Sequence, residues 1–152
     1  MGVPQARPDT GGMPPTVLVV DDDAGFRRVA RRLLRMRGLV VVADVADGEA
    51  ALEAVRRLRP DGVLLDVHLP RQDGLSVTRA LAARPDAPSI VLTSTEALGL
   101  PDAVLVNCGA RAFVAKERLV EADLLRLFSP AGTGARPAPD GAGPRRTGPD
   151  QA

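Results

Sequence analysis

Residues 16–23 of this chain read TVLVVDDD, a short apolar run followed directly by three acidic residues. The four consecutive apolar residues, three of them Val, form a run that is typical of a strand buried on both faces and too short for an independent helix. The run ends abruptly in three carboxylates. In an open parallel α/β sheet, ligands bind at the carboxyl ends of the strands, so Asp21, Asp22 and Asp23 mark a candidate site. Taken alone, one of these residues is better explained as a cap of the next helix, and the rest of the sequence reverses that preference.

Short apolar runs alternate with amphipathic patterns through residues 16–128. This alternation predicts a parallel sheet covered by helices on both sides, and therefore an α/β fold in a single domain. After the first strand we expect further strands at residues 39–42, 62–66, 89–93 and 112–115. We expect helices from about Phe26 to Gly38 and at residues 47–59, 75–83, 102–107 and 117–128.

The composition excludes several classes of protein. Apolar residues make up 45% and charged residues 26% of the 152 residues, as in ordinary globular proteins with a core. A net charge of +1 gives no general attraction to nucleic acid or to a membrane, and one cysteine, Cys108, forms no internal disulfide. No apolar run approaches membrane-spanning length and no signal peptide is evident, so we expect a cytoplasmic protein.

The two ends of the chain differ in composition from its middle. Residues 1–15 are rich in Gly and Pro and are interpreted as a flexible leader, and residues 129–152 as a disordered Pro/Gly-rich tail. The predicted folded domain therefore covers residues 16–128. We expect no effector module after Phe128, so a DNA-binding regulator is disfavoured.

Polar side chains end four of the predicted strands. A parallel sheet brings these ends to one edge, where several carboxylates repel one another and demand a counter-charge. A hard divalent cation such as Mg²⁺ meets that demand, and a lysine adds a second positive charge. A carboxylate nucleophile, a hard cation, a lysine and a hydroxyl are the parts needed to receive a phosphoryl group. The residues concerned are Asp21, Asp22, Asp23, Asp66, Thr93 and Lys116.

The chain resembles the receiver domains of two-component response regulators over nearly all of residues 16–128. The resemblance rests on five motifs in order: VLVVDDD, ADGEAAL, PDGVLLDVHLPRQDG, VLTS and GARAFVAK. Each motif is weak alone, but five with suitable spacing are very specific. The resemblance implies a flavodoxin-like, doubly wound, five-stranded sheet with strand order 2-1-3-4-5.

The resemblance also implies a phosphorylation site. Asp66 would accept the phosphoryl group from a phosphohistidine of a sensor histidine kinase, in a phosphorelay that requires Mg²⁺. Asp22 would bind the metal directly, Asp21 largely through water, and Asp66 and the backbone carbonyl of His68 would complete the protein's share of the ligands.

Three further positions receive roles from the resemblance. Thr93 would bond a phosphoryl oxygen once Asp66 is modified, and Lys116 would pair with another. Phe113 stands where the family has an aromatic ring that swings inward when the hydroxyl moves. Thr93 and Phe113 would therefore form the switch.

Other polar residues have simpler interpretations. Asp23 is better explained as a helix cap than as a ligand. The arginines of the first helix lie opposite its apolar stripe, which favours a solvated face, although this helix contributes to kinase docking in receiver domains. The segment Leu98-Gly99-Leu100-Pro101 interrupts the fourth helix where the family transmits its signal.

The sequence therefore predicts a stand-alone receiver whose output is a contact with a downstream protein or onward phosphotransfer. It is consumed stoichiometrically, so we do not class it as an enzyme. Two alternatives stay open: a phosphorylation-independent binding module, and an Asp-nucleophile phosphohydrolase. Such hydrolases need a second acid two residues after the nucleophile, where this chain has His68.

Overall fold

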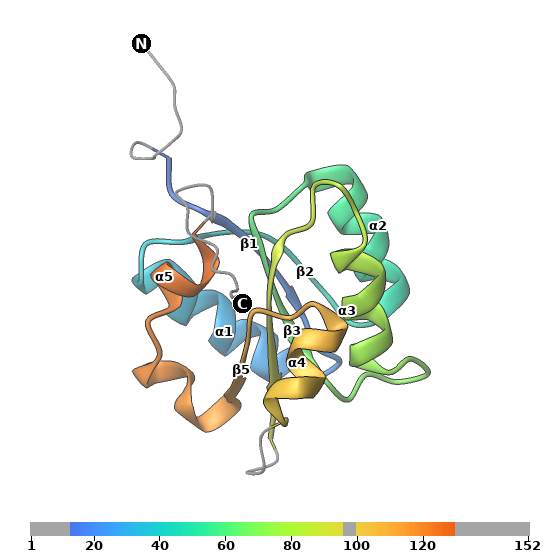
Figure 1. Ribbon diagram of the computed structural model, residues 1–152. Helices are drawn as coiled ribbons and strands as arrows, with labels where there is room; N and C mark the ends of the chain where they lie inside the picture. Colours follow the sequence, from blue (N-terminus) through green and yellow to red (C-terminus); the bar gives the residue numbers. More distant parts are fainter. Residues whose placement is uncertain (1–12, 96–99, 130–152) are drawn as a thin grey trace, which may run out of the picture. The chain divides into compact units, whose positions relative to one another are not determined.

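The computed structural model describes residues 13–95 and 100–129 (Figure 1). One compact unit runs from Pro15 to Ser129, close to the predicted boundaries of 16 and 128. The leader and the tail predicted from composition lie almost wholly outside the described residues, as does half of the segment at residues 98–101.

The sheet has five parallel strands in the order β2-β1-β3-β4-β5. This arrangement confirms the predicted fold class and strand order. Each strand is a short apolar run, as a sheet covered on both faces requires. The strands are β1 (Thr16–Val20), β2 (Val40–Val45), β3 (Gly62–Asp66), β4 (Ser89–Ser94) and β5 (Ala112–Ala115).

Helices cover both faces of the sheet. Figure 1 shows α1 and α5 on one face and α2, α3 and α4 on the other. The helices are α1 (Ala24–Met36), α2 (Gly48–Leu58), α3 (Gly74–Ala82), α4 (Asp102–Cys108), the 3₁₀ helix η2 (Lys116–Glu121) and α5 (Leu124–Phe128). In the described part of the chain, none of these helices has the length and apolar character that crossing a membrane would take.

Aspartates begin the first three helices. The side chains of Asp23, Asp47 and Asp73 accept hydrogen bonds from backbone N–H groups in the first turns of α1, α2 and α3. Such caps satisfy amides that have no partner within the helix. The interpretation of Asp23 as a cap is confirmed.

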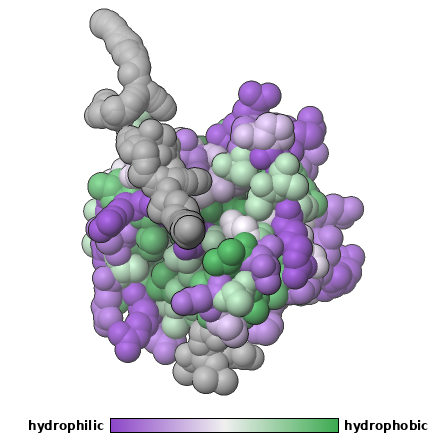
Figure 2. Space-filling model, in the orientation of Figure 1, coloured by the Kyte–Doolittle hydropathy of each residue, from purple (hydrophilic) through white to green (hydrophobic). Residues whose placement is uncertain are grey.

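Alternate residues of the central strands supply two separate cores. In β1, Leu18 and Val20 pack towards α2, α3 and α4, whereas Val17 and Val19 pack towards α1, η2 and α5. All four side chains are buried, because successive side chains of a strand point to opposite faces. At the surface, Figure 2 shows hydrophilic residues around the rim of the molecule and some apolar residues in the region of α4 and β5.

The second strand lies later in the chain than predicted. Leu39 belongs to the turn after α1, where its N–H donates to the carbonyl of Leu34. The strand instead continues to Val45, since residues 43–45 pair with β1. Because β2 is an edge strand, it accommodates the polar Asp44 that ended the apolar pattern in the sequence.

The single closing helix predicted at residues 117–128 is wrong. The chain forms η2, breaks at Ala122, and starts again as α5, whose first turn is capped by the side chain of Asp123. The guanidinium of Arg37 donates to the carbonyls of Val120 and Ala122. These bonds, made by a residue 85 positions away from Ala122, replace the helical pattern that the local sequence favours. Val120 in η2 is 60% exposed.

Phe128 should anchor α5 to the sheet. Its ring is fully buried and contacts Gly62, where an added methyl group would overlap the ring. We expect Phe128→Ala to lower the free energy of unfolding by about 3–5 kcal/mol, measured by urea denaturation. Leu125→Ala in the same helix is the control; this side chain is 43% exposed, so the loss should stay below about 1 kcal/mol. Equal losses would contradict this assignment of the core.

Candidate phosphoryl-acceptor site

Three aspartates meet at the carboxyl ends of two neighbouring strands. Asp21 and Asp22 follow β1, and Asp66 ends β3, which pairs with β1 in parallel. One carboxylate oxygen of each lies within 4.8 Å of the others. The structure thus brings together the three carboxylates that the sequence predicted to converge, and it leaves Asp23 outside the group as a cap.

Asp21 is the fully buried member of the cluster. Its Oδ1 accepts a hydrogen bond from the N–H of Asp23 at 2.9 Å. Its Oδ2 is buried and accepts no hydrogen bond of good geometry, but it lies 2.6 Å from Nζ of Lys116. This oxygen has a charge partner and retains capacity to bind a further cation.

Lys116 is placed between two of the acids. Its Nζ lies 3.5 Å from Oδ2 of Asp66, in addition to its contact with Asp21, and 4.2 Å from the centre of the Phe26 ring. Burial alone would lower the pKa of Lys116, but the close contact with the negative charge of Asp21, followed by that with Asp66, raises it overall. The lysine therefore stays protonated and holds the two carboxylates together.

The surroundings of Asp66 disfavour the charged form of its carboxyl group. Burial raises the pKa of Asp66, and the negative charge of Asp21 adds to this effect. The backbone N–H of His68, which donates to Oδ1 at 3.0 Å, and the charge of Lys116 oppose the rise without cancelling it. The ionised form of Asp66 is thus less stable here than in water.

The predicted switch residues lie on β4 and β5. Thr93 is buried and stands opposite Asp66 in the β3–β4 register. Its hydroxyl donates to the carbonyl of Val114 at 2.6 Å, so it is engaged with β5. Phe113, next to Val114, is partly buried against the core on the α2–α4 side. These placements do not test the predicted movement of either residue.

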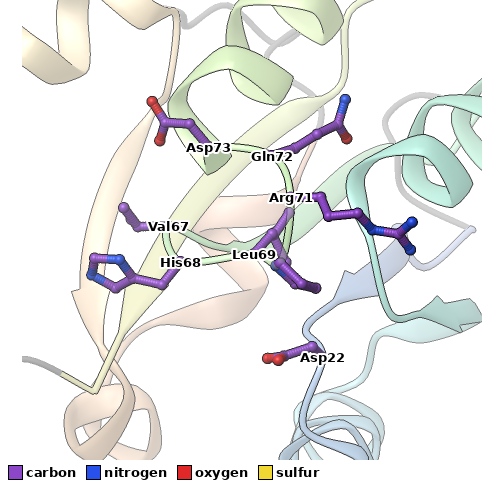
Figure 3. Close-up of a pocket in the computed structure, with 8 residues that line it drawn as sticks. Asp22, Val67, His68, Leu69, Arg71, Gln72 and Asp73 are labelled. Atoms are coloured by element: carbon purple, nitrogen blue, oxygen red, sulfur yellow. The ribbon is translucent and has the colours of Figure 1, made fainter.

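A cavity of about 510 Å³ opens beside the acids. Asp22 forms one side of it, and the loop of residues 67–73, which follows β3, forms the other (Figure 3). Figure 3 shows the side chains of His68 and Arg71 pointing to opposite sides of this loop. Of the three acids, Asp22 lines this cavity.

The donor set fits a magnesium ion. Carboxylate oxygens are the ligands that hard divalent cations prefer, and the three acids carry more negative charge than Lys116 balances. Asp21, Asp22 and Asp66 are the residues that would hold the ion. The predicted participation of the His68 carbonyl stays a prediction, since the described contact of His68 with Asp66 is made by its N–H.

The sequence did not identify Phe26 and Arg27 as neighbours of the site, nor the pairing of Arg27 and Arg31 with Asp44. Phe26 was predicted only as the approximate start of the first helix, and its ring lies against Lys116. Arg27 and Arg31, predicted on a solvated face, instead form ion pairs with Asp44 at 2.9 and 2.7 Å. Both side chains are partly exposed, and the sequence did not predict their pairing with Asp44. An acidic residue inside the apolar run VVVADV was the signal available for this pairing.

The chain belongs to the response regulator receiver domain family, whose model matches residues 17–126. This match confirms the predicted resemblance and makes the chain a receiver domain of the two-component type. Among its relatives, it is 36% identical over 139 residues to protein-glutamate methylesterase/protein-glutamine glutaminase 5 of Anaeromyxobacter dehalogenans, covering 87% of this chain and 38% of that protein. It is 40% identical over 116 residues to response regulator MprA of Mycobacterium sp. strain KMS, covering 76% of this chain and 50% of the relative.

Solved structures give the same result. The receiver domain of the putative response regulator NarL from Mycobacterium tuberculosis aligns with a TM-score of 0.65 at 29% identity, covering 76% of this chain and 98% of that one. The response regulator domain of Thermotoga maritima CheB aligns with a TM-score of 0.62 at 25% identity, covering 75% and 87%. The chain spans half or less of the length of the two relatives named above, so their whole-protein activities are not transferred to it.

We predict that Asp66→Asn stabilises the metal-free protein at neutral pH. Because the pKa of Asp66 is raised, the folded state binds more protons than the unfolded state between the ordinary and the raised pKa of this group. Stability should therefore fall as pH increases through that window, and the uncharged amide should remove this loss. The measurement is thermal unfolding of the wild type and of Asp66→Asn in the presence of a chelator, from pH 4 to about pH 8. An Asp66→Asn protein that is less stable than the wild type at about pH 8 would contradict this prediction.

Magnesium should stabilise the folded chain. An ion that binds only the folded state raises the melting temperature with its concentration, and excess chelator should reverse the increase. Asp22→Asn, which replaces an exposed member of the cluster, should weaken this response with little change in metal-free stability. The melting temperature is measured by differential scanning calorimetry at increasing concentrations of MgCl₂, in buffer free of calcium. An unchanged response in Asp22→Asn would exclude this residue as a ligand.

Proposed function

We propose that this protein accepts a phosphoryl group on Asp66 from a phosphohistidine of a sensor histidine kinase, with Mg²⁺ bound by the neighbouring acids. The observation that carries the proposal is the meeting of three carboxylates with the ammonium of Lys116, beside an open cavity. Membership of the receiver family supports it.

In the proposed step, a carboxylate oxygen of Asp66 forms a bond to phosphorus as the bond between phosphorus and the imidazole nitrogen breaks. The electron pair of that bond returns to the imidazole, and the product is an aspartyl phosphate. Mg²⁺, when bound, neutralises phosphoryl oxygens, and such transfer depends mainly on positioning and charge neutralisation. Lys116 lies 3.5 Å from Asp66 and can pair with a phosphoryl oxygen after transfer.

Thr93 provides the proposed link to the rest of the molecule. Its hydroxyl is bonded to the carbonyl of Val114, and that bond must break for the hydroxyl to reach a phosphoryl oxygen. Phosphorylation would thereby favour a second arrangement of β5 and of Phe113 beside it. Output through a downstream protein or a phosphotransfer protein follows as part of the proposal. The cytoplasmic location expected from the sequence stays a prediction.

Incubation of the full chain with a small-molecule phosphodonor and Mg²⁺ tests the proposal. We expect a phosphorylated adduct, seen by intact-protein mass spectrometry, that hydroxylamine releases because it is an acyl phosphate. Asp66→Asn and excess chelator should each abolish it. Asp86→Asn, which changes an exposed aspartate that pairs with Arg84, should label like the wild type.

The alternatives give different results in the same experiment. Repeated turnover of the donor without any trapped adduct would support a phosphohydrolase that uses Asp66 as its nucleophile. No adduct and no turnover, with Mg²⁺ bound, would support a binding module that keeps the fold without phosphorylation. An adduct that persists in Asp66→Asn would contradict the assignment of the acceptor.

A further inference from the structure

The main chain of Asp21 is held by two hydrogen bonds, one at its N–H and one at its carbonyl. The N–H of Asp21 donates to the carbonyl of Val45 in β2 at 3.0 Å. The carbonyl of Asp21 accepts a hydrogen bond from Nη1 of Arg27 at 2.7 Å. This carbonyl belongs to the peptide between the two acids, so its orientation sets the direction in which the side chain of Asp22 leaves the main chain.

Arg27 is itself fixed by an acid on β2. Its Nε donates to Oδ1 of Asp44 at 2.9 Å, and Oδ2 of Asp44 accepts from Nη1 of Arg31 at 2.7 Å. The side chains of Arg27 and Asp44 are only 20% and 24% exposed. Because a guanidinium is a rigid planar fork, fixing Nε on Asp44 aims Nη1 at the carbonyl of Asp21.

Asp22 needs this support more than the other acids do. The carboxylate of Asp21 is held by the N–H of Asp23 and by Lys116, and that of Asp66 by the N–H of His68. The side chain of Asp22 is exposed and makes no hydrogen bond or ion pair with the described residues. Its direction therefore depends on its main chain alone.

We propose that Arg27 is a positioning residue of the magnesium site, which holds the Asp21–Asp22 peptide so that Asp22 faces the other two acids; this inference rests on the proposed function. Groups that orient metal ligands without touching the metal contribute strongly to affinity. The positive charge of Arg27 would by itself repel Mg²⁺, and Asp44 offsets that charge. The contribution of Arg27 is thus one of geometry.

Arg31 offers a matched control for Arg27. Both arginines come from α1 and both pair with Asp44, but only Arg27 reaches Asp21. Arg27→Gln and Arg31→Gln therefore remove the same charge from the same partner, and only the first breaks the contact with the metal site. Removing the charge alone would tighten Mg²⁺ binding in both variants, opposite to the effect expected from lost positioning.

The test is a titration of the full chain with MgCl₂, followed by NMR of the backbone amides of residues 21–23. We expect the Kd for Mg²⁺ to rise about tenfold or more in Arg27→Gln, the usual range for a lost orienting contact, and to stay within about twofold of wild type in Arg31→Gln. At saturating Mg²⁺, Arg27→Gln should be labelled by a phosphodonor at the wild-type rate. A rate that stays low at saturation would indicate general damage and overturn the proposal.

Wild-type Mg²⁺ affinity in Arg27→Gln, or an equal loss in both variants, would also overturn it. A wild-type chain whose amides do not respond to Mg²⁺ would instead contradict the proposed function itself, which separates the two failures. If Arg27→Gln does not fold, Arg27→Lys takes its place. A lysine keeps the charge but cannot contact Asp44 and Asp21 together, so it should weaken Mg²⁺ binding in the same direction.

Discussion

The interaction on which this structure depends is the repulsion among three carboxylates and its relief by one ammonium. One carboxylate oxygen each of Asp21, Asp22 and Asp66 lies within 4.8 Å of the others, and among the residues that the structure describes Lys116 is the cation paired with two of them. Such a cluster lowers the stability of the fold unless its members are paired. Burial first, and then the negative charge of Asp21, raise the pKa of Asp66, so its charged form is disfavoured in the folded protein. A rigid framework is therefore needed to keep the acids together.

The central strands supply that framework. β1 and β3 are neighbours at the middle of the sheet, with buried side chains on both faces, so the residues that follow them have little freedom. Lys116 begins η2, directly after β5 at the edge of the sheet, and reaches the cluster across the end of β4. Phe26, from the first turn of α1, lies against its ammonium. Strand order and helix placement thus determine where each charge stands.

The features predictable from the sequence were those encoded by nearby residues. Strands at residues 62–66 and 112–115 match the structure because each is a continuous apolar run between turn residues. The convergence of Asp21, Asp22, Asp66 and Lys116 followed from the rule that parallel strands end at one edge. The break at Ala122 and the pairing of Arg27 with Asp44 could not be predicted this way. Each depends on an arginine and a partner that is distant in the sequence: Arg37, in the turn after α1, contacts Ala122, and Arg27 of α1 contacts Asp44.

Two contacts between residues distant in the sequence, Thr93 with Val114 and Arg37 with Ala122, connect the site and the elements after it to the rest of the fold. Thr93 is buried beside Asp66 in the register, and its hydroxyl spans from β4 to the main chain of β5. A change in its partner would release the carbonyl of Val114, whose neighbour Phe113 packs against the core that α4 also covers. Because η2 and α5 replace a single long helix after β5, the surface beyond that strand is built from two short elements joined to α1 through Arg37. A displacement of β5 would therefore affect two regions: the core that α4 covers, and the segment of η2 and α5 that Arg37 joins to the end of α1.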